Sequence, residues 1–288
     1  MNAIAAALEG LIDYAGLYPP AALDMPSAVH NYLAYREQKH AFALGRFIVD
    51  AARLDELRVN AGSSISKMRL SVIVPAVVEP HILSALSDPE FPIESTETKG
   101  DQPLTIARIC EKLPFNLERY CEIPMQTACS GTVDAIASVG ARAKLRMGGV
   151  VAEAFPPTEH VIHKLRILAD RRVAFKATAG LHHPIRSPHP LTYSAHSPTA
   201  TMHGFINLLC AAAMVHFGVS NQDVLDQDVA AVLEDQPPHA FRASPGSLGW
   251  RGFEWTTDQV REVRQFFTSF GSCSFTEPIH DLEVLGWL

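Results

Sequence analysis

The sequence has few cysteines, and their arrangement excludes several classes of protein. Among 288 residues there are five, and no two of them stand in a CxxC pair. An odd number of dispersed cysteines is not typical of a disulfide framework, and structural zinc sites usually need CxxC pairs. The first residues, MNAIAAALEGLIDY, also lack the basic segment of a secretory signal. We therefore expect reduced thiols and a cytoplasmic location. The five are Cys110, Cys121, Cys129, Cys210 and Cys273.

Long hydrophobic runs and an excess of positive charge are also missing. A membrane helix needs about 20 apolar residues, and the best run, from Phe205 to Val215, is interrupted by Asn207. Lysine and arginine number 24 against 31 aspartates and glutamates, which gives a net charge of −7 with neutral histidines. A negative chain is a poor match for nucleic acid or for an anionic membrane. We expect neither as a partner.

What is present is the composition of a globular protein. Hydrophobic residues make up 47% and charged residues 19% of the chain, which excludes a disordered chain, a coiled coil and a collagen-like fibre. No linker-like segment divides the sequence, so we expect a single domain over residues 1–288. The low charge content is compatible with a homodimer.

Short β-like runs alternate with helix-like runs along the whole chain. Strands that alternate with helices predict an α/β fold with a closed (β/α)8 barrel, also called a TIM barrel, and a doubly wound open sheet is the alternative. The eight predicted strands are Leu11–Ala15, Arg46–Asp50, Arg69–Val74, Ile93–Lys99, Glu118–Ile123, Arg142–Met147, Val173–Thr178 and His239–Ser244. Helices with a regular apolar stripe are predicted from Thr158, over Asp101–Leu113, and from Thr257 through Phe270.

Several segments depart from a minimal barrel. Met1–Gly10 predicts a short helix that plugs the amino-terminal end of the barrel. Leu181–Ala200, rich in proline and histidine, predicts a long loop after the seventh strand, and such loops are typical of lids or binding loops. Two helices, near Met202–Phe217 and Asn221–Leu233, then follow where one is expected, and Gly271–Leu288 forms a C-terminal tail.

Two lysines are the strongest chemical signal. In a barrel, alternate side chains point into the lumen, and active sites lie at the carboxyl ends of the strands. In the sixth predicted strand, AKLRMGG, this alternation turns Lys144, Arg146 and Gly148 inward. In the seventh, VAFKATAG, it turns Lys176 and Thr178 inward. Repulsion between two neighbouring ammonium groups and partial burial both lower a lysine pKa, and a neutral amine adds to carbonyl carbon. The alternative is that each lysine pairs with a carboxylate and stays charged.

Carboxylates are available for either arrangement. In the fourth strand, IESTETK, Glu97 and Lys99 share one face and Glu94 lies on the other, and we take Glu97 and Lys99 as inward. Glu122 of the fifth strand and Asp13 at the end of the first strand are further candidates. Such groups would serve as acids and bases in the reaction, or would only hold the lysines charged.

Histidines gather after the seventh strand. Five of the 13 histidines lie between Leu181 and His203. His182 and His183 follow the strand directly, and with Glu122 they provide an alternative set of ligands for a divalent metal. An adjacent histidine pair is not a diagnostic metal spacing, and HExxH is absent. We therefore expect no cofactor and assign His182 and His183 to substrate binding.

A phosphate site is suggested by the last two predicted strands, because barrels often bind phosphate with the loops that follow strands seven and eight. Gly180 follows the seventh strand, and Arg242 and Ser244 lie at the end of the eighth, before a Pro-Gly-Ser turn. We expect a small carbonyl compound or a sugar phosphate as the substrate. The segment GSCSFTEP stands out through Cys273 and Glu277, for which we expect a packing role. The substrate-binding candidates are Arg146, Lys99, Thr178, Gly180, His182, His183, Arg242 and Ser244.

These segments resemble those of deoxyribose-phosphate aldolase and its relatives, which are class I aldolases on a (β/α)8 barrel. LIDYAGLYPPA is similar to the family's Ile-Asp-His-Thr-x-Leu-x-Pro stretch, and AKLRMGG to its Ile-Lys-Thr-Ser-Thr-Gly segment. AFKATAGL is similar to Phe-Lys-Pro-Ala-Gly-Gly-Val, and FRASPGS loosely to Phe-Gly-Ala-Ser. The resemblance is clearest over Ala141–Leu181, fair over Leu11–Pro20, and topological elsewhere.

The resemblance implies a lyase that binds its substrate as a Schiff base on Lys144. It further implies that Lys176 lowers the pKa of Lys144 and that an acid on the fourth strand moves protons. Glu97, with Glu94 as the alternative, would replace the family's aspartate.

This sequence departs from the family's pattern at several positions. Arg146 and Met147 replace small hydroxyl residues, Gly180 lacks a second glycine beside it, and His182 replaces an arginine. These departures weaken the phosphate cradle and indicate a distant relative with another substrate. A metal-dependent barrel enzyme and a non-catalytic barrel that binds a small molecule are the alternatives.

Overall fold

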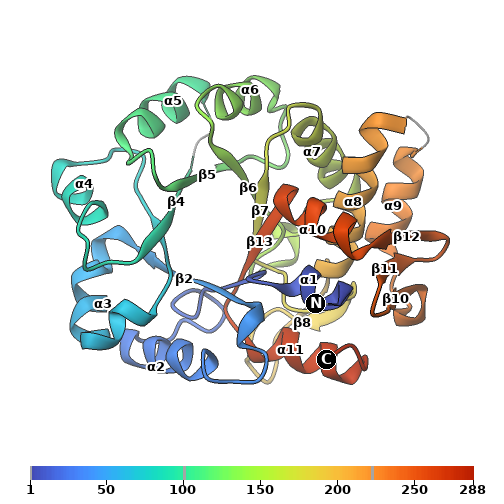
Figure 1. Ribbon diagram of the computed structural model, residues 1–288, viewed down its shortest axis with the longest axis horizontal. Coiled ribbons are helices and arrows are strands. Elements are labelled where there is room, and N and C mark those ends of the chain that lie inside the picture. Colours follow the sequence, from blue (N-terminus) through green and yellow to red (C-terminus); the bar gives the residue numbers. More distant parts are fainter. Residues whose placement is uncertain (1, 100–101, 222–223) are drawn as a thin grey trace.

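Eight parallel strands close into a barrel in the computed structural model, which describes residues 2–99, 102–221 and 224–288 (Figure 1). Their order around the barrel is β1-β13-β7-β6-β5-β4-β3-β2. The predicted (β/α)8 architecture is therefore confirmed. The barrel strands are β1 (Ile12–Tyr14), β2 (Leu44–Asp50), β3 (Leu70–Ile73), β4 (Ile93–Lys99), β5 (Glu118–Ile123), β6 (Arg142–Arg146), β7 (Phe175–Thr178) and β13 (Phe267–Ser272).

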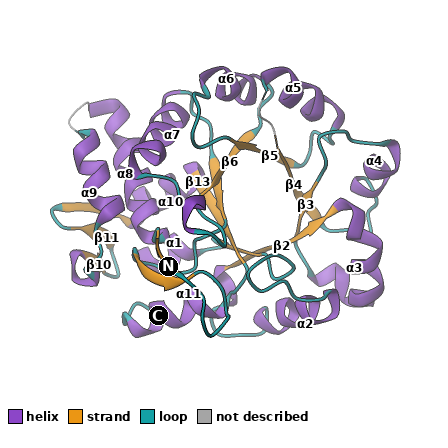
Figure 2. Cartoon of the chain, turned by 180° about the vertical axis from the view of Figure 1, so that it is seen from behind, coloured by secondary structure: helices purple, strands orange, loops and turns teal. Residues whose placement is uncertain are grey.

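Helices form a layer around the strands, as Figure 2 shows from the opposite side. They bury their apolar stripes against the barrel: α7, for example, buries Val161, Leu165 and Leu168 at helical spacing. Met1 and Asp101, with which two of the predicted helices begin, lie outside the described residues. The helices of this layer are α2 (Met25–Tyr35), α3 (Leu54–Ala61), α4 (Pro80–Leu86), α5 (Pro103–Lys112), α6 (Ser130–Ser138), α7 (Thr158–Asp170), α8 (Phe205–Asn221) and α10 (Thr257–Phe266).

The eighth barrel strand is not the predicted segment His239–Ser244. Its place is taken by β13, which pairs in parallel with both β1 and β7. The apolar residues up to Phe270 keep a helical spacing, but α10 ends at Phe266, where the Arg264 guanidinium donates to the carbonyl of Phe267 at 2.6 Å. The strand that follows puts the small, buried Ser269 into the lumen, where its hydroxyl donates to a buried carboxylate.

The predicted eighth strand belongs to a small sheet outside the barrel. Strand β10 (Phe241–Ala243) pairs antiparallel with β11 (Ser247–Trp250), which pairs with β12 (Phe253–Thr256). This sheet lies at the edge of the molecule, near α9 (Asp226–Glu234) (Figure 1). The two helices expected between the seventh and eighth strands, α8 and α9, are present.

Three other predicted segments differ from expectation. The loop after β7 contains an antiparallel hairpin, β8 (Ser187–Pro190) and β9 (Thr199–Met202). The predicted tail supplies the end of β13 and a further helix, α11 (Thr276–Val284). Helix α1 (Ala3–Leu8) packs against α10 instead of plugging the barrel. Its apolar side chains are buried against α10, which lies outside the lumen. Among the described residues, no helix has both the length and the apolar character needed to cross a membrane.

The lumen of the barrel is unusually polar. The hydrophobic core lies between the strands and the surrounding helices, whereas buried charged and hydroxyl side chains fill the space inside the strands. Buried charges are costly unless they are paired, so the lumen must contain a network of contacts. The buried polar side chains contributed by the barrel strands are Asp13, Ser71, Ser95, Thr96, Glu97, Thr98, Lys144, Lys176, Ser269 and Ser272.

Candidate active site

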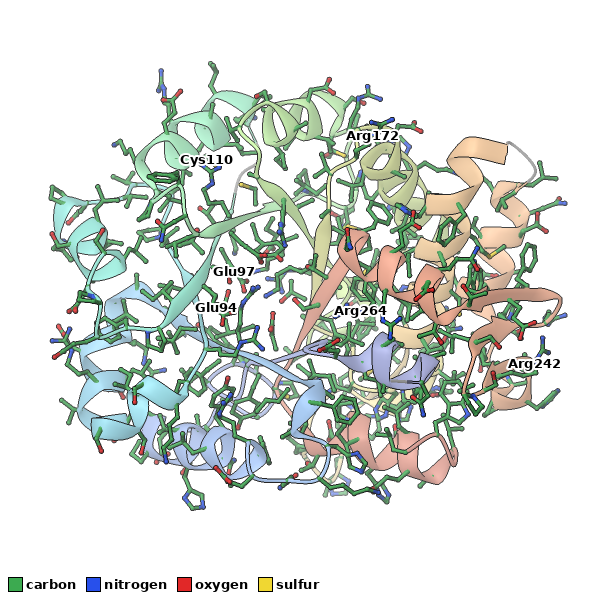
Figure 3. The ribbon with its side chains drawn as sticks, in the orientation of Figure 1. Glu94, Glu97, Cys110, Arg172, Arg242 and Arg264 are labelled. Atoms are coloured by element: carbon green, nitrogen blue, oxygen red, sulfur yellow. The ribbon has the colours of Figure 1, made fainter. Side chains whose placement is uncertain are left out.

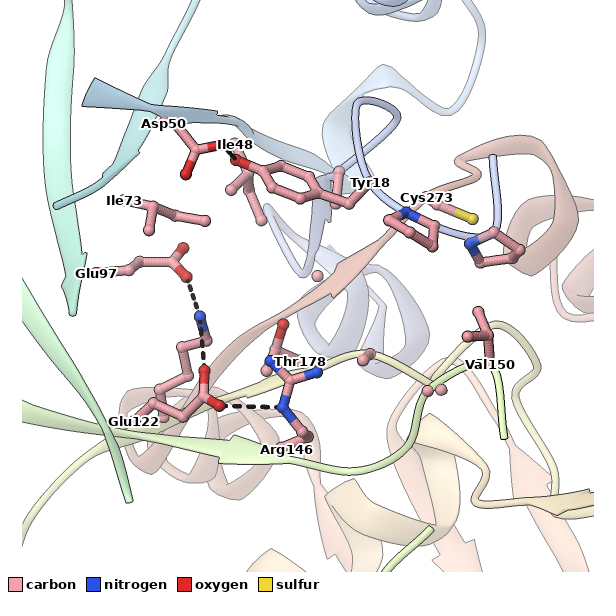
Figure 4. Close-up of a pocket in the computed structure, with 18 of the residues that line it drawn as sticks. Tyr18, Ile48, Asp50, Ile73, Glu97, Glu122, Arg146, Val150, Thr178 and Cys273 are labelled. Carbon is pink, nitrogen blue, oxygen red and sulfur yellow. Dashed lines mark hydrogen bonds and ion pairs between the residues drawn. The ribbon is translucent and has the colours of Figure 1, made fainter. Parts of the chain in front are cut away.

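A cavity of about 1120 Å³ lies at the carboxyl ends of the barrel strands, where barrel enzymes bind their substrates (Figure 4). Ile48, Ile73 and Val150 contribute apolar surface, and charged side chains from β4, β5 and β6 line its floor. Six of the predicted substrate-binding residues line it: Lys99, Arg146, Thr178, Gly180, His182 and His183.

A buried glutamate connects the two predicted lysines. Lys144 on β6 and Lys176 on β7 are register partners. Glu97 on β4 places Oε2 at 2.8 Å from the Nζ of Lys144 and Oε1 at 2.6 Å from the Nζ of Lys176. Asp13 on β1 binds Lys176 from the other side, with Oδ2 at 2.6 Å from Nζ. A carboxylate therefore contacts both ammonium groups, and a second one fixes the deeper lysine.

For Lys176 this arrangement contradicts the predicted lowering of the lysine pKa, and the alternative, a lysine that pairs with carboxylates and stays charged, is what the structure shows. Burial alone would lower the pKa of Lys176, but Asp13 and Glu97 outweigh it and raise that pKa above its usual value. Burial would likewise raise the pKa of Glu97, but Lys144 and Lys176 hold it well below its usual range. Lys176 thus carries a fixed positive charge that Glu97 and Asp13 balance. The sequence indicated that these residues face inward, but not that Glu97 joins the two lysines.

Toward the cavity the same network continues through Glu122 on β5. Its Oε2 lies 3.2 Å from the Nζ of Lys144, and its Oε1 accepts from the Nε of Arg146 at 3.0 Å (Figure 4). Side-chain exposure rises along this path, from 0% for Lys176 through 7% for Lys144 to 45% for Arg146. Lys144 therefore stands between a fully buried pair of charges and groups that reach the cavity.

Two predicted substrate-binding residues lie elsewhere. Arg242 and Ser244 belong to the small outer sheet and the turn after β10, and Figure 3 shows Arg242 at the edge of the molecule, away from Glu97. They were placed wrongly because β13, and not the segment around them, is the eighth strand. Glu94, the alternative acid, is also remote from the lysines: it binds Arg46 and Arg69.

The segment after β13 brings unexpected groups to the cavity. The Nδ1 of His182 lies 2.9 Å from Oε2 of Glu277, and its Nε2 lies 3.9 Å from the sulfur of Cys273. The hydroxyl of Tyr193 approaches the same sulfur to 3.5 Å. Burial opposes the charge of His182, but its contacts with Cys273 and Glu277 raise its pKa to about 9. Cys273 and Glu277 line the cavity, so they do not serve packing alone, as was expected from the sequence.

His183 has a different partner from His182. Its Nδ1 lies 2.6 Å from Oδ2 of Asp281 on α11, and its ring stacks on that of His189 with centroids 3.3 Å apart. Over the described part of the chain, no group of three or more His, Cys, Asp or Glu side chains is arranged to hold a metal ion. In the structure each of these two histidines contacts a carboxylate of its own, and Glu122 binds cations.

Gly180 allows two loops to meet at the cavity wall. Its φ angle is +69°, and a Cβ atom on it would lie 2.7 Å from the Cα of Gly148, which follows β6. Only glycine fits both the backbone angle and this approach. The close contact joins the loops after β6 and β7, which follow the strands that carry the two lysines.

The comparisons with known proteins add no family to this description. The chain matches no protein-family model and no curated protein.

Proposed function

We propose that the protein is a lyase of the class I aldolase type, which binds a carbonyl substrate as a Schiff base on Lys144. The observation that carries the proposal is the position of Lys144. Its amine lines the cavity at the carboxyl end of a barrel strand and lies between two carboxylates, Glu97 and Glu122. A lysine that must react with a carbonyl needs a group to accept its proton and a negative charge to stabilise the iminium ion.

Glu122 and Glu97 are suited to different parts of this task. Glu122 borders the cavity, so it can take the proton of Lys144 and exchange it with substrate or solvent, although Lys144 and Arg146 outweigh its burial and lower its pKa too. Glu97 is bound by Lys176 and has a strongly lowered pKa. It therefore stays ionised and would stabilise the positive charge of an iminium at Nζ, while Asp13 keeps Lys176 in place. This division assigns proton transfer to Glu122 and differs from the role that the family resemblance implies for Glu97.

The chemical steps follow from these groups. The neutral amine of Lys144 adds to the carbonyl carbon, and the carbinolamine loses its oxygen as water to give an iminium ion. The iminium accepts the electron pair of the carbon–carbon bond that breaks, which leaves an enamine on the lysine and releases a carbonyl fragment. Protonation of the enamine and hydrolysis restore Lys144. Since the chain supplies the amine and the carboxylates, the reaction needs no cofactor.

The cavity also bears on the class of substrate. The corner after the eighth strand, where barrels often bind phosphate, holds the carboxylate of Glu277 beside His182. A carboxylate there repels a phosphate, so we favour a carbonyl compound without one. The apolar side chains of Ile48, Ile73 and Val150 would contact its carbon skeleton.

Borohydride trapping tests the proposal. Small aldehydes and ketones are incubated with the protein, the iminium is reduced, and the modified lysine is identified by peptide mass spectrometry. We expect a reduced adduct on Lys144 with at least one compound, and none in Lys144→Arg. Lys67→Arg removes an exposed lysine and serves as the control that keeps the adduct. An adduct spread evenly over surface lysines, or no adduct with any carbonyl compound, would reject the Schiff-base mechanism.

A further inference from the structure

The contacts of Cys273, His182 and Glu277 have the form of a nucleophile, a base and a group that orients the base. His182 faces the Cys273 sulfur with one ring nitrogen, at 3.9 Å, and the Glu277 carboxylate with the other, at 2.9 Å. A nucleophile next to a base that a third group holds is the arrangement found in thiol-dependent acyl transfer. Such contacts are often longer before a substrate binds than during the reaction.

The three residues come from separate parts of the fold and meet only at the cavity. Cys273 follows β13, His182 follows β7, and Glu277 lies in the first turn of α11. All three line the same cavity as Lys144. Figure 4 shows Cys273 on a different side of this cavity from Glu97 and Glu122. The thiol therefore faces the same space as the lysine but belongs to a separate cluster.

Ionisable groups surround the sulfur of Cys273. The raised pKa of His182 means that its imidazolium form is present at neutral pH, next to the thiol. The ionisable groups around Cys273 are His182 after β7, Tyr193 between β8 and β9, Glu277 on α11 and Tyr14 on β1. Among these, His182 supplies a positive charge next to the sulfur, and the Tyr193 hydroxyl lies 3.5 Å from the sulfur, within reach of a hydrogen bond.

We propose that Cys273, His182 and Glu277 form a second catalytic centre, which takes an acyl group from an ester or a thioester. The thiolate sulfur attacks the carbonyl carbon, a carbon–sulfur bond forms, and the bond to the leaving group breaks. His182 gives its Nε2 proton to that leaving group. A water molecule then returns a proton to His182 as its oxygen attacks the acyl carbon, and the carbon–sulfur bond breaks. The net reaction is hydrolysis of the ester, and it does not depend on the chemistry of Lys144.

The other four cysteines offer an internal comparison. Each is buried and none lines the cavity, whereas Cys273 does. The sulfurs of Cys110 and Cys121 contact each other at 3.8 Å, which lowers the pKa of Cys110, but neither residue lines the cavity. Burial raises the pKa of Cys210. We therefore expect Cys273 to react first with a thiol reagent. Iodoacetamide at pH 6, followed by peptide mapping, should label Cys273 at least ten times faster than any other cysteine in the unmodified protein.

The acyl step is tested with 4-nitrophenyl acetate. We expect a burst of nitrophenolate near one equivalent per chain and an acetyl group on the peptide that contains Cys273. Cys273→Ser should abolish the burst, His182→Gln should lower its rate by about 100-fold, and Glu277→Gln by about tenfold. His216→Gln serves as the matched control, since it removes a histidine–glutamate pair of 3.0 Å outside the cavity. It should change the rate by less than twofold.

Several outcomes would overturn the second centre. One is acetylation of lysines without acetylation of Cys273, and another is a burst that His182→Gln leaves unchanged. Equal labelling of all five cysteines at pH 6 would also reject it, and this readout needs no variant. Because peptide mapping reads the thiol and borohydride reduction reads the amine, failure of this proposal is distinguishable from failure of the Schiff-base proposal.

Discussion

The two ends of the barrel carry ion-pair networks built by the same strands, yet with different cations. Strand β6 contributes Arg142 at its amino end and Lys144 further along, and β4 contributes Glu94 and Glu97 in the same order. At the amino end the partners are arginines: Arg46 binds Glu94, and Arg142 binds Glu118. At the carboxyl end the buried cations are the two lysines, and Arg146 binds Glu122 nearer the cavity. Strands β4, β5 and β6 thus repeat a pairing of charges in which the buried cations beside Glu97 are lysines instead of arginines.

That change separates a network that supports the fold from one that is suited to chemistry. An arginine guanidinium does not release its proton in proteins, and it holds carboxylates in a fixed, forked geometry. A lysine amine can lose its proton and attack a carbonyl. The cavity with apolar walls lies at the carboxyl end, with the lysines, while the amino end has a smaller and more polar cavity of about 510 Å³. Substitutions at the two ends should therefore differ in their effects on reactivity and on stability.

The largest effect is expected from exchanging the cations at the two ends of β6. Lys144→Arg keeps a positive charge between Glu97 and Glu122 but cannot form an imine. We expect the proposed lyase activity to fall by at least about 1000-fold and the borohydride adduct to disappear. Arg142→Lys, at the other end of the strand, should keep the adduct yield within about twofold. An active Lys144→Arg protein would contradict the assignment of Lys144.

The two glutamates of β4 should differ in their effect on stability. Glu97→Gln removes a fully buried charge that balances two lysines, and we expect a loss of about 3 kcal/mol in the free energy of unfolding. The side chain of Glu94 is 35% exposed, so its ion pairs are partly screened by solvent. For Glu94→Gln we therefore expect a loss of about 1 kcal/mol in the free energy of unfolding. Urea unfolding of both variants measures the difference. Equal losses would show that burial does not set the strength of these contacts.

The thiol cluster, which consists of Cys273, His182 and Glu277, should make the free energy of unfolding depend on pH. The network of arginines at the amino end of the barrel should not. The pKa of His182 is raised to about 9 in the folded protein, against about 6.5 in the unfolded chain. Its stabilising contribution is therefore complete below about pH 6.5 and is lost as the pH rises through about 9.

Unfolding in urea at pH 6 and at pH 10 measures this dependence. The stability gap between the unmodified protein and His182→Gln should shrink by up to about 3 kcal/mol at the higher pH. For Arg142→Lys the gap should change much less. A constant gap for His182→Gln would mean that the histidine is neutral in the folded state.

The smallest effect is expected from two glycines with left-handed backbone angles. Gly180 has a φ of +69° and a Cβ on it would collide with Gly148. Gly10, near the amino end, has a φ of +56°, and a Cβ on it would make only an ordinary contact of 3.8 Å with the Arg69 side chain. Gly180→Ala should cost about 2 kcal/mol through strain and displacement of the loop, and Gly10→Ala about 1 kcal/mol through the angle alone. Thermal unfolding compares them, and equal shifts would rule out crowding at Gly180.

The lysine end of the barrel could be predicted from the sequence because it depends on local alternation. Lys144 and Lys176 sit in short strands in which apolar side chains alternate with charged or polar ones. This alternation fixes which side chains face inward, and both strands are found where it puts them. Pairing could not be predicted in the same way, since the contact between Glu97 and Lys176 spans 79 residues of chain.

The thiol cluster was missed because one strand was misassigned. Phe266, Phe267 and Phe270 continue the helical spacing of α10, so nothing local marks the point at which the helix ends. A strand assignment for FTSFGS would have placed Cys273 at a carboxyl end, facing the cavity. The sequence separation of 95 positions from His182 to Glu277 would still have concealed their contact.

The order of the strands along the chain has a consequence for the newly made protein. The barrel closes between β1, its first strand, and β13, its last, with Ile12 opposite Phe270. On a ribosome the other seven strands emerge before β13, so the growing chain has neither a closed barrel nor the residues that complete the thiol cluster. The closed barrel and the cluster of Cys273, His182 and Glu277 are therefore complete only when synthesis has passed Glu277. The topology thus delays the assembly of both proposed centres until the last barrel strand has been made.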